Sequence, residues 1–494
     1  MQRLPAFFLA LLSLVLLGVS ARAAPSNEQY FSVLLDGRKL GEFVSTRASN
    51  GNQVETTQTL ELTMDRAGTS IHVRTREVNR ETIDGKPLSF ESTTSLSGGE
   101  SMIRGTISDG VLHVTRSNGS KENTERSMAW PDGALLAEGL RLAGLKVDQK
   151  AGSRYRLLAF QAASLDSVWI DGVIGETTAV ALPDGDKRLT ENTQILEFPG
   201  APMTVHAWLD ADGMVWKQTI PIFGVEVTML ACDRACAEAP NQTSDVFSRM
   251  LMHAPRVLAA RDLAADGLRY ELIANGEVTL PQTDEQHVRT QGKAIIVDIL
   301  RRAPIHTTTS DAESAPNAAD SASTEWLQSS APEIVALARK ASAGEIQPLQ
   351  RMRRLETFVR SFIANKNLNV GYASALEVAH KPEGDCTEHA VLLAALGRAL
   401  EIPTRVVTGL VYAPQFAGRD RVFVPHAWVQ AWINDRWQSF DAALNGFDAS
   451  HIALSVGDGD PWRFYAGINA LGNLHLQSVE ALNGNSREHD KRSN

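Results

Sequence analysis

Short β-prone runs alternate with Asp-Gly pairs through the first half of the chain, over residues 29–229. The pairs include Asp36-Gly37, Asp84-Gly85, Asp109-Gly110, Asp171-Gly172 and Asp212-Gly213. Asp-Gly tolerates the positive φ angles of tight hairpins, so flanking runs such as YFSVLL and VLHVT are expected to form paired antiparallel strands. The pattern predicts a β-rich N-terminal domain over residues 24–243, in which the helix-like stretch 133–145 covers one end of the sheet.

Two further segments precede the C-terminal part of the chain. Residues 244–304 contain β-like runs, RYELIA and GKAIIVDILRR, which predict a small β module. Residues 307–324 are rich in Ala, Ser, Asp and Thr and hold no large apolar residue, so they cannot bury a core. We expect a flexible linker over residues 305–328.

Helical spacing begins after this linker. The sequence Ser330-Ala331-Pro332-Glu333 is typical of a helix start with proline in its first turn. Apolar residues then recur at helical spacing and predict a stripe that packs against a core: Leu355, Phe358, Val359, Phe362 and Ile363. We expect an α+β domain over residues 329–480 and a polar tail over residues 481–494.

The composition is that of a globular protein with several domains. The 494 residues are 43% hydrophobic and 21% charged, and three of them are cysteines. The formal net charge of -10 leaves no basic field that would attract a phosphate backbone, so nucleic acid is not an expected partner.

The N-terminus has the pattern of a signal peptide, residues 1–23. Arg3 supplies a positive charge, residues 4–19 are apolar, and Ala21-Arg22-Ala23 is typical of a cleavage site. The alternative, an uncleaved membrane anchor, is supported less well by so short a stretch. We therefore expect a bacterial protein that is periplasmic or secreted, with no stable membrane insertion after cleavage.

Cys232 and Cys236 lie four residues apart in MLACDRACAEAP, and an oxidising compartment would let them close a small disulfide loop. Two free thiols and a metal site remain alternatives, although no nearby histidine or further cysteine completes a tetrahedral set. Disulfide pairing would leave Cys386 as an odd cysteine that requires its own explanation.

Cys386 lies in EGDCTEHAVLLAALGRALEIPTRVVTGLVY, at the expected start of a helix. Asp385 and Glu388 have the spacing of a capping box, and the following apolar run predicts a central core helix. At the first helical position the helix dipole favours the thiolate, which is the reactive form of cysteine. The alternative, an inert buried cysteine, fits its charged neighbours less well.

A second segment, PHAWVQAWINDRWQSFDAAL, has alternating patterns on both sides of Asn434-Asp435. If these two residues form a hairpin loop, His426 and Asp441 are diagonal neighbours on one face of the sheet. A carboxylate there could orient the imidazole, as a nucleophile, base and orienter set requires. The alternative is a histidine that only satisfies a local hydrogen bond.

The segments GDCTEHA, IPTRVVTGLVY and HAWVQAWINDRWQSFDAAL resemble the three core motifs of the transglutaminase-like superfamily, in the order Cys, His, Asp. The resemblance covers residues 367–444 and the helices that lead into them. It implies a papain-like α+β core with Cys386 as nucleophile, His426 as general base and acid, and Asp441 as the residue that holds His426. It implies no metal and no organic cofactor.

Other roles for nearby residues are weaker alternatives. His389 lies one turn after Cys386 but lacks an obvious orienting carboxylate. A metal site of Cys386, His389 and His426 would leave Asp441 without a role. The backbone N–H of Cys386 can supply one oxyanion donor, but spacing does not assign a second donor to Tyr372 or Trp428.

These observations predict an exported thiol enzyme, a cysteine peptidase or amidase, that acts on a peptide or glutamine carboxamide through an acyl-enzyme. We expect a protein or peptide substrate and slightly favour hydrolysis. The alternatives are a protein cross-linking transglutaminase and, from another class, a non-catalytic binding or scaffold protein of the envelope. The oligomeric state does not follow from the sequence.

Overall fold

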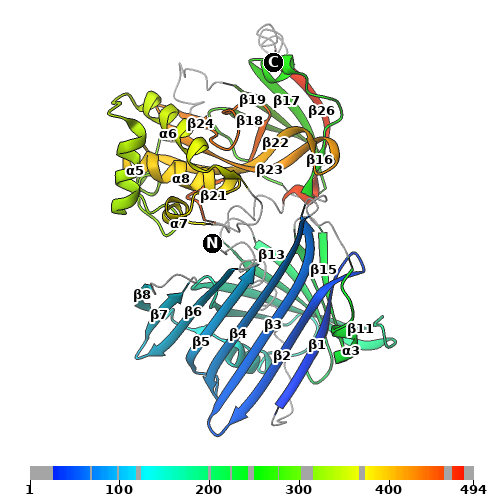
Figure 1. Cartoon of the computed structure of the whole chain (residues 1–494). Coiled ribbons are helices and arrows are strands. Elements are labelled where there is room, and N and C mark those ends of the chain that lie inside the picture. The colour runs from blue at the N-terminus through cyan, green and yellow to red at the C-terminus, as the bar shows by residue number, and fades with distance from the viewer. Residues whose placement is uncertain are drawn as a thin grey trace. The chain divides into compact units, whose positions relative to one another are not determined.

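The computed structural model describes residues 26–66, 69–96, 99–117, 124–198, 202–222, 225–242, 250–275, 278–301, 315–366, 373–460 and 470–482. The chain divides into two units, residues 1–246 and 247–494 (Figure 1). The expected signal peptide, residues 1–23, lies outside the described residues. Among the helices of the described part, none is long and apolar enough to cross a membrane.

The first unit is built on one sheet of fifteen strands. Its strands are β1 (Ser26–Leu35), β2 (Arg38–Asn50), β3 (Gln53–Arg66), β4 (Thr69–Thr82), β5 (Pro87–Leu96), β6 (Gly99–Ser108), β7 (Val111–Ser117), β8 (Thr124–Ala129), β9 (Ala134–Leu135), β10 (Arg154–Gln161), β11 (Asp166–Val180), β12 (Lys187–Glu197), β13 (Pro202–Leu209), β14 (Val215–Ile222) and β15 (Val225–Cys232). The order is β8 to β1, then β15 to β9. Antiparallel pairing of β1 with β15 therefore joins two meanders, as the mainly antiparallel prediction requires.

The Asp-Gly prediction holds at most turns and fails at one position. Asp36 and Asp109 have φ values of 46° and 50° and begin tight turns between neighbouring strands. Gly172, however, lies inside β11 opposite Tyr155 of β10. A Cβ atom at Gly172 would lie 1.9 Å from Cζ of Tyr155. This glycine serves the close approach of an aromatic ring instead of a turn.

The helix expected within residues 133–145 is α2 (Ala137–Leu145). Its N-cap residue, Leu136, has no side-chain acceptor. The carboxylate of Glu81, on β4, instead accepts the N–H groups of Glu138 at 2.6 Å and Gly139 at 2.9 Å. Burial raises the pKa of Glu81 to about 7, against the effect of these two donors. A buried acid from the sheet therefore caps the helix.

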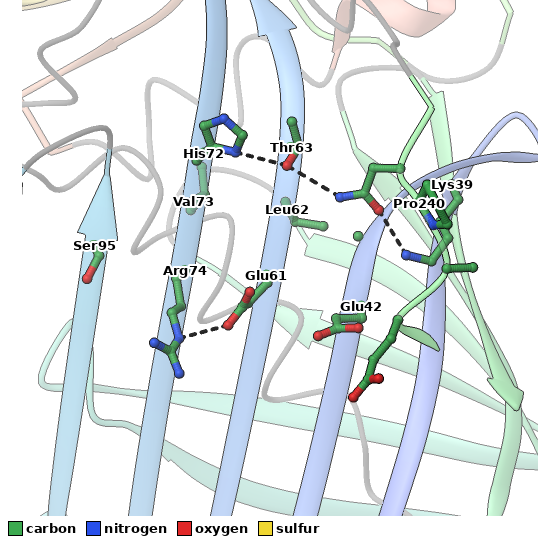
Figure 2. Close-up of a pocket in the computed structure, with 14 residues that line it drawn as sticks. Lys39, Glu42, Glu61, Leu62, Thr63, His72, Val73, Arg74, Ser95 and Pro240 are labelled. Carbon is green, nitrogen blue, oxygen red and sulfur yellow. Dashed lines mark hydrogen bonds and ion pairs between the residues drawn. The ribbon is translucent and has the colours of Figure 1, made fainter. Parts of the chain in front are cut away.

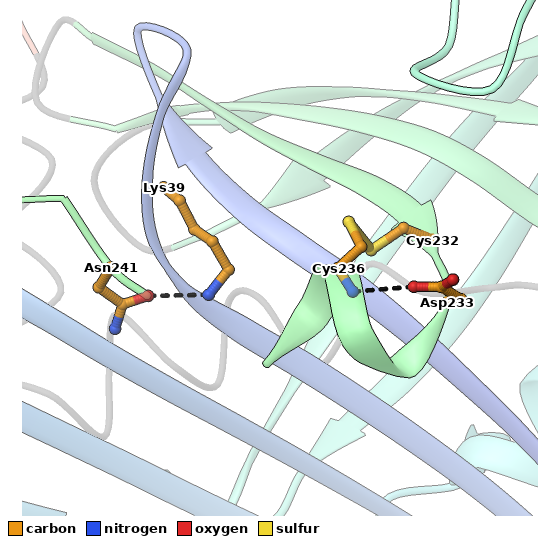
Figure 3. The surroundings of a disulfide bond; sticks show 5 residues. All are labelled: Lys39, Cys232, Asp233, Cys236 and Asn241. Carbon is orange, nitrogen blue, oxygen red and sulfur yellow. Dashed lines mark hydrogen bonds between the residues drawn. A yellow bond between two sulfur atoms is a disulfide. The ribbon is translucent and has the colours of Figure 1, made fainter. Parts of the chain in front are cut away.

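The two cysteines at the end of the sheet form the expected disulfide. Cys232 ends β15 and Cys236 lies in α3 (Arg234–Ala237), as Figure 3 shows. Asp233 caps this short helix, because the N–H of Cys236 donates to its Oδ1 at 2.8 Å. Residues 238–242 then reach β2, where Lys39 Nζ donates to Asn241 Oδ1 at 2.9 Å.

A polar pocket of about 630 Å³ lies where this segment meets β2 to β5 (Figure 2). Its lining includes acidic and basic side chains, among them the ion pair of Glu61 Oε1 with Arg74 Nε at 2.9 Å. Burial and the nearby Glu61 raise the pKa of Glu42 in the same lining. The mixture of charges gives the pocket no clear preference for one ligand class.

The second unit combines helices with two larger sheets. Its helices are α4 (Ala260–Leu263), α5 (Pro332–Ser342), α6 (Pro348–Phe362), α7 (Ala375–His380) and α8 (Cys386–Ala399). One sheet has the order β16 (Met252–His253), β23 (Arg419–Trp432), β22 (Thr404–Phe416) and β25 (His451–Gly457), with β24 (Trp437–Phe440) paired to β23. The other has the order β18 (Gln286–Gln291), β19 (Ala294–Leu300), β17 (Gly267–Ala274) and β26 (Leu474–Leu482).

The sheet pairing corrects the expectation of a separate β module over residues 244–304. β17 pairs with β26, close to the end of the chain, and β16 pairs with β23. Strands from this segment therefore complete the sheets of the second unit. The local β pattern was sufficient to predict the strands but carried no information about their distant partners.

The described part of the expected linker, residues 315–328, also packs into the second unit. Leu327 is fully buried. The carbonyl of Ala322 accepts from Arg398 Nη1 at 2.6 Å, and that of Trp326 accepts from the N–H of Ala375 at 2.9 Å. The prediction of a flexible linker is therefore wrong for residues 315–328. The backbone carbonyls of this polar segment accept hydrogen bonds from Arg398 of α8 and Ala375 of α7, and these bonds hold the segment in place.

Candidate functional site

Cys386 is the first residue of α8, the central helix of the second unit. Every residue from 387 to 398 is buried, and α8 packs against β22, β23 and the helices α5, α6 and α7 (Figure 1). The predicted capping box is confirmed: Asp385 Oδ1 accepts the N–H of Thr387 at 2.9 Å, and Glu388 Oε2 accepts the N–H of Asp385 at 2.9 Å. The thiol therefore lies at a fixed helix start.

Two features next to the cap hold this turn in place. Gly384 has a φ of 143°, and a Cβ atom there would lie 2.4 Å from Cγ of Glu388. Glu388 is fully buried and also accepts the N–H of Ala373 at 3.0 Å through Oε1. Burial raises the pKa of Glu388 well above its usual range. The acid therefore connects the loop before α7 to the start of α8.

The environment of Cys386 opposes the thiolate that the helix start was expected to favour. Burial raises the pKa of the thiol well above its usual range, and the carboxylate of Asp385 acts in the same direction. The backbone N–H of Ala427 donates to Cys386 Sγ and acts the other way, more weakly. Burial and the nearby carboxylates therefore act on the thiol in the direction opposite to the one expected from the helix start.

The hairpin that carries the other two predicted residues has the expected register. Asn434 and Asp435 have φ values of 53° and 59°, which two-residue hairpin loops require. Trp432 lies opposite Trp437, and Val429 lies opposite Phe440. Asp441 follows directly after β24 and so comes close to His426 on β23.

His426 and Asp441 are hydrogen-bonded in the interior. His426 Nε2 lies 2.8 Å from Asp441 Oδ2, and the two residues are 4% and 0% exposed. The other oxygen, Oδ1, accepts the N–H groups of Ala443 at 2.8 Å and Leu444 at 3.1 Å. Burial opposes ionisation of Asp441, but its interactions with His426, followed by those with His451, hold its pKa well below the usual range.

His451 is a member of this cluster that the sequence analysis missed. It begins β25, is 2% exposed, and places Nε2 3.1 Å from the same Oδ2 of Asp441. Its Nδ1 lies 3.1 Å from Asp448 Oδ1. The local signal was an Asp-x-x-His spacing before an alternating β-prone run, which by itself does not indicate a partner.

Two weaker candidates from the sequence have other contacts. His389 Nδ1 lies 2.6 Å from the backbone oxygen of Asp385, and burial lowers the pKa of its imidazole. Trp428 Nε1 donates to Ser439 Oγ at 3.2 Å, so the indole N–H that was considered as an oxyanion donor already has an acceptor. Tyr372 lies outside the described residues. The structure therefore brings His426, and not His389, to Asp441.

The donor atoms of His426, Asp441 and His451 lie within 4.8 Å of one another, a spacing that could hold a metal ion. An ion at this position would have to replace both hydrogen bonds to Asp441 Oδ2. In the described residues, Nε2 of His426 and Nε2 of His451 are already hydrogen-bonded to Asp441 Oδ2, so we assign this cluster no metal.

Comparison with known proteins identifies the C-terminal part. Residues 335–442 match the family model of the transglutaminase-like superfamily, which confirms the resemblance of the sequence motifs. The matched range includes Cys386, His426 and Asp441 and ends before His451. The chain therefore carries a transglutaminase-like domain in its C-terminal part, after a large and mostly antiparallel N-terminal sheet. No curated protein matches the chain.

Solved structures resemble parts of the chain at low identity. A candidate cysteine protease from Cytophaga hutchinsonii is 16% identical, with a TM-score of 0.28, over 44% of this chain and 86% of its own. A β-barrel-like protein of a domain of unknown function from Brucella abortus is 14% identical, with a TM-score of 0.31, over 43% and 97%. A candidate protease from Parabacteroides distasonis is 10% identical, with a TM-score of 0.20, over 82% and 68%.

Proposed function

We propose that the transglutaminase-like domain is a thiol enzyme that acts on an amide bond of a protein or peptide through an acyl-enzyme. One arrangement carries this proposal: α8, which begins at Cys386, packs against β23, the strand that carries His426, and Asp441 Oδ2 lies 2.8 Å from Nε2 of His426. The bond to Asp441 leaves Nδ1 of the imidazole to exchange a proton with the thiol. This is the order of nucleophile, base and orienter that acyl transfer uses.

The chemical steps follow from this arrangement. Nδ1 of His426 takes the proton of Cys386, and Sγ bonds to the carbonyl carbon of the substrate. The backbone N–H of Cys386, at the first position of α8, is a donor for the oxyanion. His426 then gives its proton to the nitrogen as the C–N bond breaks and the amine leaves. Water, deprotonated by His426, attacks the thioester and releases the acid and the thiol.

The raised pKa of Cys386 defines the resting state of this proposal. With the thiol protonated, His426 must remove the proton as the sulfur attacks, so the imidazole has to be neutral before each turnover. A stored thiolate and imidazolium pair is not required.

Hydrolysis is favoured over transfer to an amine. A cross-linking enzyme must keep water from its acyl-enzyme, for which aromatic walls beside the thiol are suited. The tryptophans of the hairpin pack in the core: Trp428 and Trp437 are 2% and 1% exposed, and the rings of Trp432 and Trp437 are 5.5 Å apart. Trp428 and Trp437 are therefore occupied in packing, which supports a cysteine peptidase or amidase over the cross-linking alternative.

A labelled glutamine peptide and a labelled peptide library, each supplied with and without excess primary amine, test the reaction. We expect release of acid or cleaved peptide, and its loss in Cys386→Ala. Amine incorporation that outpaces hydrolysis would make the protein a transglutaminase. No turnover and no covalent labelling of Cys386 would favour the non-catalytic binding or scaffold alternative.

The papain-like core and the export of the protein are further parts of the proposal. A cysteine helix packed on antiparallel strands supports the first. The Cys232–Cys236 disulfide supports the second, because disulfides persist in oxidising compartments such as the periplasm. Terminal sequencing of protein from the native envelope fraction should find a mature N-terminus at or near Ala24. A cytoplasmic protein that retains Met1 would contradict export.

A further inference from the structure

His451 lies between two carboxylates, one at each ring nitrogen. Nε2 is 3.1 Å from Asp441 Oδ2, and Nδ1 is 3.1 Å from Asp448 Oδ1 and 3.0 Å from the backbone oxygen of Asp448. One donor competes at Nδ1, the N–H of Asp448 at 3.3 Å. Two oxygens at shorter distances favour a proton on Nδ1, and with a second proton on Nε2 toward Asp441 the ring would carry a positive charge.

The surroundings of His451 confine it. Its ring centroid lies 5.2 Å from that of Trp428 and 4.9 Å from that of Phe447. The titratable or charged groups that face it directly are Asp441, Asp448 and His426, and Tyr270 and Glu356 lie beyond the two aspartates. Burial disfavours the imidazolium, but the hydrogen bonds and charges of the two aspartates raise the pKa of His451 to about 9.

We propose that His451 is held as an imidazolium between Asp441 and Asp448 and acts as a positioning residue for the His426–Asp441 pair. Oδ2 of Asp441 accepts from two histidines while Oδ1 accepts from two backbone N–H groups. The carboxylate therefore has donors on both oxygens and cannot rotate without losing several of them. This inference rests on the proposed function, since it assigns how the base of that same site is held.

The fixed charge also lies close to the imidazole of His426. The ring centroids of His451 and His426 are 5.6 Å apart, so the imidazolium that forms at His426 during each proposed turnover meets a second positive charge in a buried site. Removal of the charge at His451 should therefore change the pH dependence of turnover, which a purely structural role would not do.

Two variants separate charge from hydrogen bonding. His451→Gln keeps a donor toward Asp441 and removes the charge, whereas His451→Leu removes both. We expect kcat to fall about 10- to 100-fold in His451→Gln, by analogy with groups that orient functional ligands, with KM nearly unchanged. The pH dependence of kcat/KM should also change, because the charge beside His426 is lost. His451→Leu should lower kcat further than His451→Gln does. The matched control is His475→Gln, at an exposed position on β26, and its kcat should equal that of the unsubstituted protein.

Nitrogen-15 NMR of histidine-labelled, unsubstituted protein tests the charge without any turnover. We expect His451 to show two protonated ring nitrogens at pH 7 and to lose one proton near pH 9. A single protonated nitrogen at pH 7, or a His451→Gln profile identical to that of the unsubstituted protein, would overturn the inference. Absence of turnover in the unsubstituted protein would instead defeat the proposed function and leave the NMR result to decide the charge of His451.

Discussion

The backbone N–H of Asp441 donates to Oε1 of Glu356 at 2.8 Å, so helix α6 holds the end of β24. Burial raises the pKa of this glutamate, against the effect of the donor. Glu356→Ala leaves the Asp441 N–H without its acceptor in a buried site, which costs about 1 to 3 kcal/mol. We expect a lower melting temperature and reduced turnover. Glu356→Gln is the control, because its carbonyl oxygen can still accept; equal losses in both variants would contradict this role.

Asp441→Asn should nearly abolish turnover and still fold. The amide oxygen can keep the two backbone donors on Oδ1, so the amide nitrogen replaces Oδ2 and meets the N–H groups of His426 and His451. His426 must then adopt the tautomer that carries its proton on Nδ1, which cannot take a proton from the thiol. We expect kcat to fall on the order of 10³- to 10⁴-fold. Circular dichroism checks the fold, and activity within tenfold of the unsubstituted protein would contradict the assignment.

Alkylation of Cys386 should be slow at neutral pH and accelerate toward alkaline pH. The thiolate is the reactive form, and a thiol pKa held above its usual range means that the thiolate appears only as pH rises through that higher value. Rates of iodoacetamide labelling between pH 6 and about 10 measure this, with mass spectrometry assigning the site.

Asp385→Asn is the matched variant for this measurement. Asparagine can still cap the helix, but the substitution removes the Asp385 carboxylate. This carboxylate is the second-largest cause of the raised pKa of the Cys386 thiol, after burial. Labelling of Cys386 should therefore begin at lower pH in this variant. Rapid labelling of the unsubstituted protein at pH 6 would show that the thiolate is already formed at rest.

The capping box and the hairpin could be predicted because their signals are local. Asp385, Cys386 and Glu388 are close in sequence, and the loop residues Asn434 and Asp435 fix the register that brings His426 to Asp441. Helix α5 begins at Pro332 for a similar reason, since proline is suited to the first turn.

What the sequence did not predict depends on distant pairing and on burial. His451 reaches Asp441 because β25 pairs with β22, where His451 lies opposite Val411. No local pattern specifies that partner. The pKa of Cys386 depends on how completely the surrounding strands and helices cover the thiol. The order of fifteen strands likewise required the pairing of β1 with β15, which hairpin signals do not give.

Gly409→Ala should destabilise the second unit. Gly409 lies opposite His426 in the sheet, and a Cβ atom there would lie 2.0 Å from the backbone oxygen of Ile452 on β25. A backbone atom cannot yield easily, so β25 and His451 must shift, at a cost of about 1 to 3 kcal/mol. Gly418→Ala, which meets open space at a φ of 74°, should cost stability without loss of kcat. Unchanged melting in Gly409→Ala would contradict this packing.

Loss of the Cys232–Cys236 disulfide should destabilise the first unit. Cys232 and Cys236 close a very short loop, for which chain entropy predicts about 2 kcal/mol of stabilisation. Cys232→Ser with Cys236→Ser should lower the denaturant midpoint of the first unit. The labelling rate of Cys386, which lies in the second unit, should not change. A changed labelling rate would indicate that the disulfide supports the thiol site.

The pairing of β17 with β26 has a consequence for biosynthesis. During translation, α5 to α8 and β22 to β25 are synthesised after β17 and before β26. Until β26 is made, the edge of β17 that pairs with it has no partner strand. Exposed strand edges recruit other chains, so the nascent protein passes through an interval of aggregation risk that ends only when β26 arrives. Arg269 and Glu271 alternate with buried residues along β17, and charged positions of this kind reduce pairing of an exposed strand edge with other chains.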